Sequence, residues 1–178
     1  MKDLRESLEA SIRTVPDFPK KGIQFKDITP ILESPVLSRA IVAEFVKLYN
    51  GVRIDAVAGI ESRGFLFGLP LAMELNVPFI AMRKKGKLPW RTISYRYALE
   101  YGEAEIEMHE GSIKPGMQVL VHDDLLATGG TACAAAELLK MEGAEPAGFC
   151  FIIELEALHG RSRLLPFDRP LMSLLRYE

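Results

Sequence analysis

The 178-residue sequence predicts an α/β fold, in which helices flank a central, mainly parallel β-sheet. Short apolar or β-branched runs alternate with helix-like segments over most of the chain. Such alternation is typical of βαβ units, whose strands are parallel and whose crossovers are right-handed. The length and a hydrophobic content of 48% suit one domain with its own core, so we expect a single domain over residues 1–178.

The first 50 residues predict two helices separated by an irregular stretch. Apolar residues recur at helical spacing over residues 3–13, which predicts an amphipathic helix. Residues 16–30 are rich in proline and turn residues, so we expect no regular structure there. Ser34 followed by Pro35 is an N-cap with proline at the first helical position, and Gly51 is expected to end that helix.

The alternating pattern begins after this helix. Four apolar runs are short and bounded by turn residues, as buried strands are. Two helix-like segments lie among them; Pro70 is expected to bend or shorten the first, and the second is rich in alanine. The expected strands are 54–60, 79–83, 117–122 and 147–155, and the expected helices are 64–75 and 131–143.

Residues 84–110 interrupt the alternation. Their first part is basic and contains Gly86 and Pro89, and two alternating arms then face each other across Tyr101 and Gly102. This pattern predicts a long loop that leads into an antiparallel hairpin. A long insertion in a compact domain usually has a function or is disordered.

Composition and charge bear on the expected partners and location. A net charge of -2 without acidic or basic blocks gives no reason to expect nucleic acid or a membrane surface, although an anionic small molecule remains open. Cys133 and Cys150 form no CxxC pair and no metal cluster with the three histidines, so we expect buried thiols in a reducing compartment. The sequence shows neither a signal peptide nor an apolar run of ~20 residues, which makes the cytoplasm the expected location.

The most informative segment is VLVHDDLLATGGT, residues 119–131. It predicts a strand that ends in Asp123 and Asp124, a short loop, and a helix that begins near TGGT, residues 128–131. Ligands of open parallel sheets bind at the carboxyl ends of strands, and a helix N-terminus attracts phosphate. The two glycines would let an anion approach the backbone, and the threonines add hydroxyl donors.

The two carboxylates need a different role, since they repel phosphate. They suit ribose hydroxyls, a developing positive charge or Mg²⁺, so the segment predicts a ribose-5-phosphate pocket. It is neither a Walker A loop nor a GxGxxG dinucleotide motif. The duller alternative is a helix capped by Thr131 beside two exposed loop acids.

This segment resembles the phosphoribosyl pyrophosphate (PRPP) motif of the type I phosphoribosyltransferase family. The resemblance implies that family's fold, with a small hood at about residues 14–32 and a mobile catalytic loop at about 84–102. It also implies that Asp123 and Asp124 hold the ribose 2′- and 3′-hydroxyls. The residues implied to bind the 5′-phosphate are Ala127, Thr128, Gly129, Gly130 and Thr131.

Other segments resemble the adenine phosphoribosyltransferases of this family. They are DFPKKGIQFKDITP (17–30), GIESRGFLFG (59–68), RKKGKLP (83–89), LEYG (99–102), IIELEALHGR (152–161) and the C-terminal SLLRYE. The resemblance implies transfer of the 5-phosphoribosyl group from PRPP to N9 of adenine, which yields AMP and pyrophosphate in purine salvage. It further implies a homodimer, and Mg²⁺ carried by PRPP rather than by direct protein ligands.

The resemblance assigns roles to further residues. Ser62, with the peptide before it strained or even cis, would meet pyrophosphate. Glu100 would manage the proton at the purine N7, and Tyr101 would close over the site. The other pyrophosphate residues are Arg63, Arg83, Lys84 and Lys87, some reaching across the dimer, and the adenine residues are Phe25 and Leu155 at the ring faces with the backbone of Gln24 and Lys26 at its edge.

Alternatives remain for single residues and for the function. Phe25 and Leu155 could be core residues, Arg63 could form a surface ion pair, the loop lysines could be solvated, and Glu100 could face solvent on a strand. Lys26 stands where many relatives carry arginine, and Trp90 and Arg91 are unusual in the loop. A 6-oxopurine enzyme would need a donor such as lysine, which IIELEAL lacks, and a PRPP-sensing regulator would usually add a nucleic-acid-binding element.

Overall fold

The computed structural model describes residues 3–98 and 102–178. The chain forms two compact units, Met1–Glu44 and Phe45–Glu178. Helix α3 (Pro35–Leu48) begins in the N-terminal unit and ends in the C-terminal unit.

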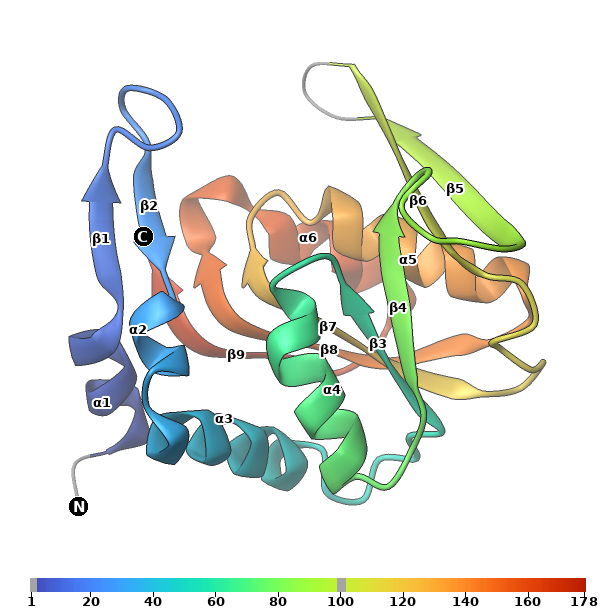
Figure 1. Ribbon diagram of the computed structural model, residues 1–178, viewed down its shortest axis with the longest axis horizontal. Helices are drawn as coiled ribbons and strands as arrows, with labels where there is room; N and C mark the ends of the chain where they lie inside the picture. The colour runs from blue at the N-terminus through green and yellow to red at the C-terminus, as the bar shows by residue number, and fades with distance from the viewer. Residues whose placement is uncertain (1–2, 99–101) are drawn as a thin grey trace. The chain divides into compact units, whose positions relative to one another are not determined.

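The N-terminal unit contains a short hairpin where we predicted an irregular stretch. Its strands pair antiparallel, with Val15 opposite Phe25 (Figure 1). The prediction was wrong at the ends of that stretch because its terminal prolines are tolerated there: Pro16 is the last residue of β1, and Pro30 lies in the first turn of α2. The turn lies between the strands, where the carboxylate of Asp17 accepts a hydrogen bond from the Gly22 N–H at 2.6 Å. The elements of this unit are α1 (Leu4–Ser11), β1 (Arg13–Pro16), β2 (Gln24–Asp27), α2 (Thr29–Leu32) and the first part of α3.

Helix α3 has the predicted N-cap. The Ser34 hydroxyl accepts a hydrogen bond from the Leu37 N–H at 3.3 Å, which satisfies one of the free donors of the first turn. The helix ends at Leu48, and Gly51 follows in the left-handed region, at φ 84°.

The C-terminal unit is built on a seven-stranded sheet of order β5-β6-β4-β3-β7-β8-β9. Strands β4, β3, β7, β8 and β9 are mutually parallel, and β6 runs antiparallel to both β4 and β5. The predicted mainly parallel sheet is therefore confirmed. The bounds are β3 (Ala56–Ile60), β4 (Phe79–Lys84), β5 (Thr92–Ala98), β6 (Glu103–His109), β7 (Gln118–Leu126), β8 (Glu145–Leu155) and β9 (Leu171–Tyr177).

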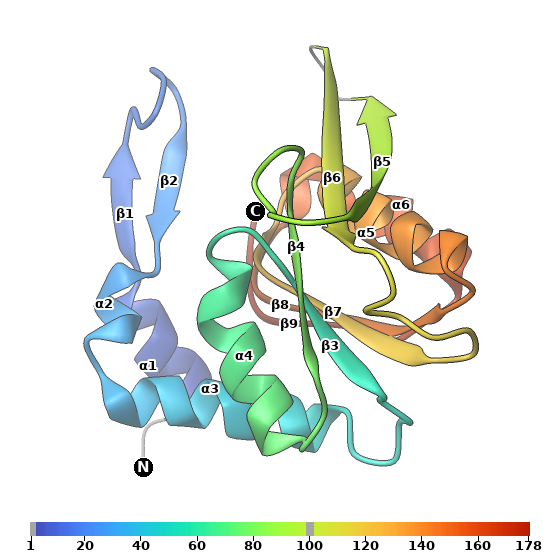
Figure 2. The same ribbon diagram turned by 45° about the vertical axis from the view of Figure 1, so that its right-hand side comes forward.

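Helices cover both faces of this sheet, with α4 on one face and α5 and α6 on the other (Figure 2). Helix α4 runs on through Pro70, so the expected shortening was wrong. Pro70 is exposed, and water can bond the carbonyl that its missing N–H leaves free. The bounds are α4 (Gly64–Glu74), α5 (Gly130–Met141) and α6 (Gly160–Leu164), with short 3₁₀ turns η1 (Glu156–Leu158) and η2 (Leu165–Phe167).

The core lies along the central strands, where β3 is buried at every position. Strand β7 is longer than predicted and continues through both aspartates, because Leu125 and Leu126 still pair with β8. The hairpin β5–β6 is confirmed up to the pair Ala98–Glu103. In the described part of the chain, no helix is long and apolar enough to cross a bilayer.

Candidate active site

The direction in which successive strands are added to the sheet reverses between β3 and β7. Strand β3 continues through α4 to β4 on one side of it, and β7 continues through α5 to β8 on the other side. The two connections leave a crevice outside the carboxyl ends of β3 and β7, which is where open α/β sheets bind ligands. The two segments predicted to bind phosphate groups, one after β3 and one after β7, both begin at this edge.

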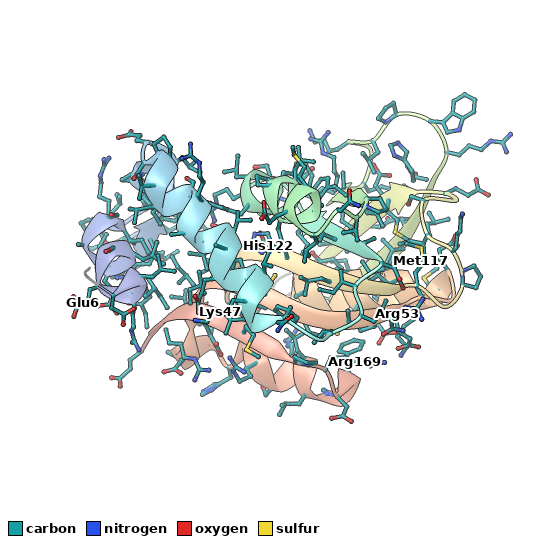
Figure 3. All side chains as sticks on the ribbon, turned by 90° about the horizontal axis from the view of Figure 1, so that it is seen from below. Glu6, Lys47, Arg53, Met117, His122 and Arg169 are labelled. Atoms are coloured by element: carbon teal, nitrogen blue, oxygen red, sulfur yellow. The ribbon has the colours of Figure 1, made fainter. Side chains whose placement is uncertain are left out.

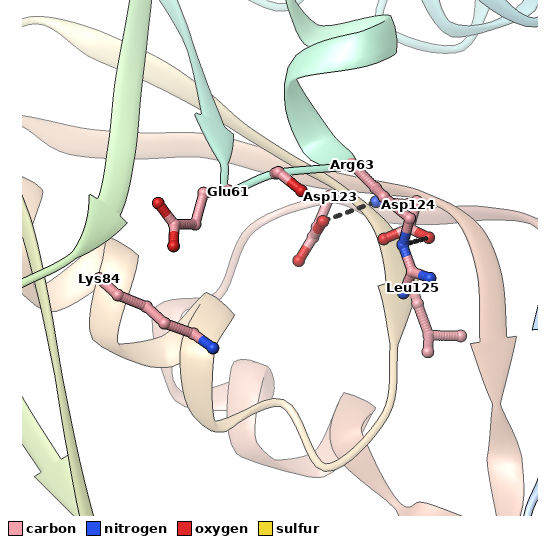
Figure 4. A pocket seen from close by; sticks show the side chains of 7 residues that line it. Glu61, Arg63, Lys84, Asp123, Asp124 and Leu125 are labelled. Carbon is pink, nitrogen blue, oxygen red and sulfur yellow. Dashed lines mark hydrogen bonds and ion pairs between the residues drawn. The ribbon is translucent and has the colours of Figure 1, made fainter. Parts of the chain in front are cut away.

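A polar cavity of about 390 Å³ occupies this edge (Figure 4). Its walls come from the loop between β3 and α4, from the end of β4 and from the end of β7. The Glu61–Ser62 peptide bond in its wall is cis, as the sequence resemblance implied. The lining residues are Glu61, Ser62, Arg63, Lys84, Asp123, Asp124 and Leu125.

Two adjacent carboxyl groups form the floor of this cavity. Asp123 Oδ1 accepts a hydrogen bond from the Asp124 N–H at 2.9 Å, and Asp124 Oδ2 lies 2.7 Å from Arg63 Nε. Burial, reinforced by the charge of Asp124, raises the pKa of Asp123 well above its usual value. Burial also raises the pKa of Asp124, and the Arg63 guanidinium opposes that rise. The pair can thus accept hydrogen bonds from a diol while carrying less repulsive charge than two exposed carboxylates.

Only some of the predicted pyrophosphate residues reach this cavity. Ser62, Arg63 and Lys84 are part of its lining. Arg83 instead pairs with Glu61, at 2.6 Å from Nε to Oε2, and its Nη1 donates to the Lys87 carbonyl at 2.7 Å. Arg83 therefore holds the basic turn, residues 84–88, against the wall of the cavity.

A buried carboxylate on β6 organises the same basic turn. Glu107 is 1% exposed, and its Oε1 accepts hydrogen bonds from the Lys87 and Leu88 N–H groups at 2.9 and 2.8 Å. Its Oε2 accepts a hydrogen bond from the Thr92 hydroxyl at 3.0 Å. Burial would raise the pKa of Glu107, but these hydrogen bonds bring it below its usual value. Sequence reasoning missed this residue, which looked like any acid on a hairpin arm.

A second, smaller cavity of about 80 Å³ lies at the start of α5. It is lined by all the residues predicted to bind the 5′-phosphate, Ala127 to Thr131, and it shares Asp123 and Leu125 with the larger cavity. Helix α5 begins at Gly130, so its first N–H groups lack helical partners and favour an anion. The predicted strand–loop–helix arrangement is confirmed.

Residues 127–131, which we call the phosphate cradle, pack against a glycine that is distant in sequence, Gly160. A Cβ atom at Gly160 would overlap the Ala127 carbonyl oxygen, and one at Gly129 would overlap the Gly160 carbonyl oxygen. Gly129 also has φ 76°, which side chains rarely adopt. The two backbones can pass this closely because both positions are glycine. Gly160 stood in a segment that resembled the family, but nothing in the sequence indicated this contact.

The residues predicted to hold adenine lie in both units. Gln24, Phe25 and Lys26 are on β2 in the N-terminal unit, where the Phe25 ring meets Phe18 edge-on at 5.1 Å. Lys26 Nζ donates to the Thr14 hydroxyl at 3.0 Å. Leu155 ends β8 and is half-buried. The predicted catalytic residues Glu100 and Tyr101 lie outside the described residues, so all these roles stay predictions.

Known proteins match this chain along almost its whole length. The model of the phosphoribosyl transferase domain family matches residues 28–166. The adenine phosphoribosyltransferase of Cytophaga hutchinsonii is 47% identical over 174 residues, which span 98% of this chain and 96% of that protein. Solved structures agree with this match.

The crystal structure of adenine phosphoribosyltransferase from Thermoanaerobacter pseudethanolicus aligns with a TM-score of 0.93 and 43% identity, over 97% of this chain and 99% of that one. The Trypanosoma brucei enzyme, solved in complex with AMP, pyrophosphate and ribose-5-phosphate, aligns with a TM-score of 0.87 and 31% identity, over 99% and 81%. From its sequence, its fold and these matches, the chain belongs to the adenine phosphoribosyltransferase family.

Proposed function

We propose that this chain transfers the 5-phosphoribosyl group of PRPP to N9 of adenine, giving AMP and pyrophosphate in purine salvage. The observation that carries the proposal is the pair of cavities at the carboxyl ends of β3 and β7, whose linings share Asp123 and Leu125. The smaller cavity lies at a helix N-terminus, which suits a phosphate. The larger cavity is lined by two carboxyl groups and by cationic side chains. PRPP requires this sequence of anion, diol and anion sites.

PRPP would lie across both cavities. Its 5′-phosphate would occupy the cradle of residues 127–131, and its ribose hydroxyls would donate to Asp123 and Asp124. Its pyrophosphate would meet Ser62, Arg63 and Lys84, with Arg83 and Lys87 holding the turn that carries Lys84. The ligands named for the Trypanosoma brucei structure are the parts of such a complex.

The chemistry is displacement of pyrophosphate at C1 of the ribose, with inversion and a transition state of oxocarbenium character. The cations at the large cavity would neutralise the leaving pyrophosphate, and the two cavities would hold the ribose in line for attack. In the described part of the chain, no group of three His, Cys, Asp or Glu side chains could hold a metal. The family resemblance implies that PRPP carries the Mg²⁺, which would supply charge neutralisation of the pyrophosphate.

The base would be recognised by residues whose roles follow from the family. Phe25 and Leu155 would contact the faces of adenine, and the backbone of Gln24 and Lys26 would read its edge. Lysine at position 26 keeps the positive charge of arginine but not its planar fork, which suits recognition through the backbone. Glu100 would manage the proton at N7, and Tyr101 would close the hairpin loop over the reactants and exclude water.

We further propose a homodimer in the cytoplasm. Leu66, Leu69 and Met73 recur at helical spacing on α4 and are 43%, 48% and 73% exposed, an apolar stripe suited to self-association. Both cysteines are free thiols, which favours a reducing compartment.

Product identification tests this function. The purified protein is mixed with PRPP, Mg²⁺ and equimolar adenine, hypoxanthine, guanine and xanthine, and the nucleotides are separated by chromatography. AMP as the main product is expected. IMP, GMP or XMP would overturn the choice of base, and PRPP binding without any nucleotide would indicate a regulator. The double variant Asp123→Asn/Asp124→Asn is the inactive control.

A further inference from the structure

A tyrosine of the β5–β6 hairpin contacts the phosphate cradle, residues 127–131. Tyr97 is on β5, and its hydroxyl oxygen lies 3.1 Å from Oγ1 of Thr131, the cradle residue in the first turn of α5. Its ring also borders Gly130, since a Cβ atom there would lie 3.7 Å from Tyr97 Cε2. The ring is packed against the hydrophobic core, which limits the freedom of the hydroxyl.

The chemistry of two hydroxyls gives this contact a direction. Each hydroxyl carries one proton, and the geometry allows either one to be the donor. A phosphate has only acceptors to offer at neutral pH, so Thr131 must donate its proton to a phosphate in the cradle. The Thr131 oxygen is then left as an acceptor, and Tyr97 becomes the donor. The filled cradle therefore orders both protons in one chain, in which each hydrogen bond strengthens the next.

The same contact ties the cradle to the hairpin. Tyr97 pairs with Ala104 on β6, and β5 ends one residue later at Ala98. We infer that Tyr97 is a positioning residue for the 5′-phosphate, which orients the Thr131 hydroxyl toward that phosphate and anchors the β5 arm to the occupied cradle. This inference rests on the proposed function, because it requires a ligand with a 5′-phosphate.

The variant Tyr97→Phe removes only the hydroxyl and keeps the packing of the ring. Binding is measured by calorimetry for AMP and ribose 5-phosphate, which carry the 5′-phosphate, and for pyrophosphate, which does not. The Kd for AMP and ribose 5-phosphate is expected to rise about 3- to 10-fold, as for one lost hydrogen bond, while the Kd for pyrophosphate stays unchanged. A merely structural role would weaken all of these ligands together.

Two further variants complete the test. Tyr95→Phe, on the same strand, should leave all three Kd values unchanged. In a Thr131→Ala background, Tyr97→Phe should have no further effect on AMP, since the hydroxyl then has no threonine to orient.

Equal weakening of pyrophosphate, an unchanged Kd for AMP, or a full Tyr97→Phe effect without the Thr131 hydroxyl would each overturn the inference. A wild-type protein that binds no AMP would overturn the proposed function, and the inference with it.

Discussion

Arg63 Nε lies 2.7 Å from Asp124 Oδ2, and this ion pair joins the loop after β3 to the end of β7. The Asp124 side chain is 5% exposed and that of Arg63 is 37% exposed. Arg63 thus has one side toward a buried carboxyl and another toward the cavity (Figure 4). It couples the charge of the proposed ribose site to the charge of the proposed pyrophosphate site.

Replacing Arg63 with alanine should change both sites at once. Asp124 would lose the cation that opposes the effect of burial, so its pKa should rise. We expect the KM for PRPP to increase roughly tenfold, about the effect of losing one hydrogen bond to a charged group, and the acid limb of the pH–rate profile to move to higher pH. Steady-state kinetics across pH would measure both.

The control is Arg53→Ala, which breaks an exposed pair with Asp55. An acid limb that stays in place in Arg63→Ala would contradict this account.

Asp123→Asn should stabilise the fold while it impairs the reaction. The pKa of Asp123 is raised in the folded protein by burial and by Asp124, so the folded state holds its proton at pH values where the unfolded state has lost it. That contribution to stability is complete below the unfolded pKa of 3.8 and is lost as pH rises through the folded pKa. Asparagine cannot ionise, so the variant should be the more stable protein at pH 8, with the difference shrinking toward pH 4.

Urea unfolding at the two pH values measures this difference, and AMP formation should fall at least 100-fold. Asp168→Asn, at an exposed position, should change neither. A variant that is less stable at pH 8 than at pH 4, relative to wild type, would count against a raised pKa.

His122 should make the fold sensitive to acid. It is fully buried on the sheet face under α4 (Figure 3), its Nδ1 lies 3.0 Å from the Cys150 carbonyl, and its Nε2 has no partner among the described residues. Burial lowers its pKa from 6.5 to about 4. Between those values the unfolded chain takes up a proton that the folded protein refuses, so about 3 kcal/mol of stability should be lost as pH falls through this window.

His122→Val should remove that slope, whatever its effect on stability at pH 7. The free energy of unfolding is measured in steps from pH 7 to pH 4, with the exposed His159→Asn as the matched variant. If the difference in unfolding free energy between His122→Val and wild type does not change from pH 7 to pH 4, His122 is not responsible.

Glu107→Gln should loosen the basic turn. The amide keeps one acceptor oxygen but brings an NH₂ group to face donors that now meet a carboxylate. We expect a several-fold higher KM for PRPP, an unchanged KM for adenine, and a loss of about 1–3 kcal/mol in stability for the unmatched buried group. Glu105→Gln, on the same strand but facing Lys85 and Ser94, should leave the KM for PRPP unchanged. Equal changes in both KM values would point to general disruption.

Local patterns in the sequence predicted the centre of the molecule well. The structure of segment 117–131 could be predicted locally, because an apolar strand, two acids and a glycine-rich helix start follow one another along the chain. The hairpin β5–β6 was equally visible, since its arms are adjacent in sequence.

Features that depend on distant partners could not be predicted. Strand β9 pairs with β8, which the chain reaches through α6 and two 3₁₀ turns, and residues 171–177 alone do not reveal that pairing. The contacts of Glu107 depend on its cross-strand register with Arg83 and Ser94. Tyr97 meets Thr131 only because β5 lies beside α5 in space.

The contact between Gly160 and the loop at Ala127 and Gly129 has a practical consequence for redesign. It joins backbone to backbone, so no choice of side chain can adjust it gradually, and any substitution at either glycine must displace the loop itself. Variant libraries intended to change the acceptor base should therefore hold residues 127–131 and 160 constant. The site for the 5′-phosphate would then bind PRPP in the same way in every variant, while substitutions are made elsewhere in the chain.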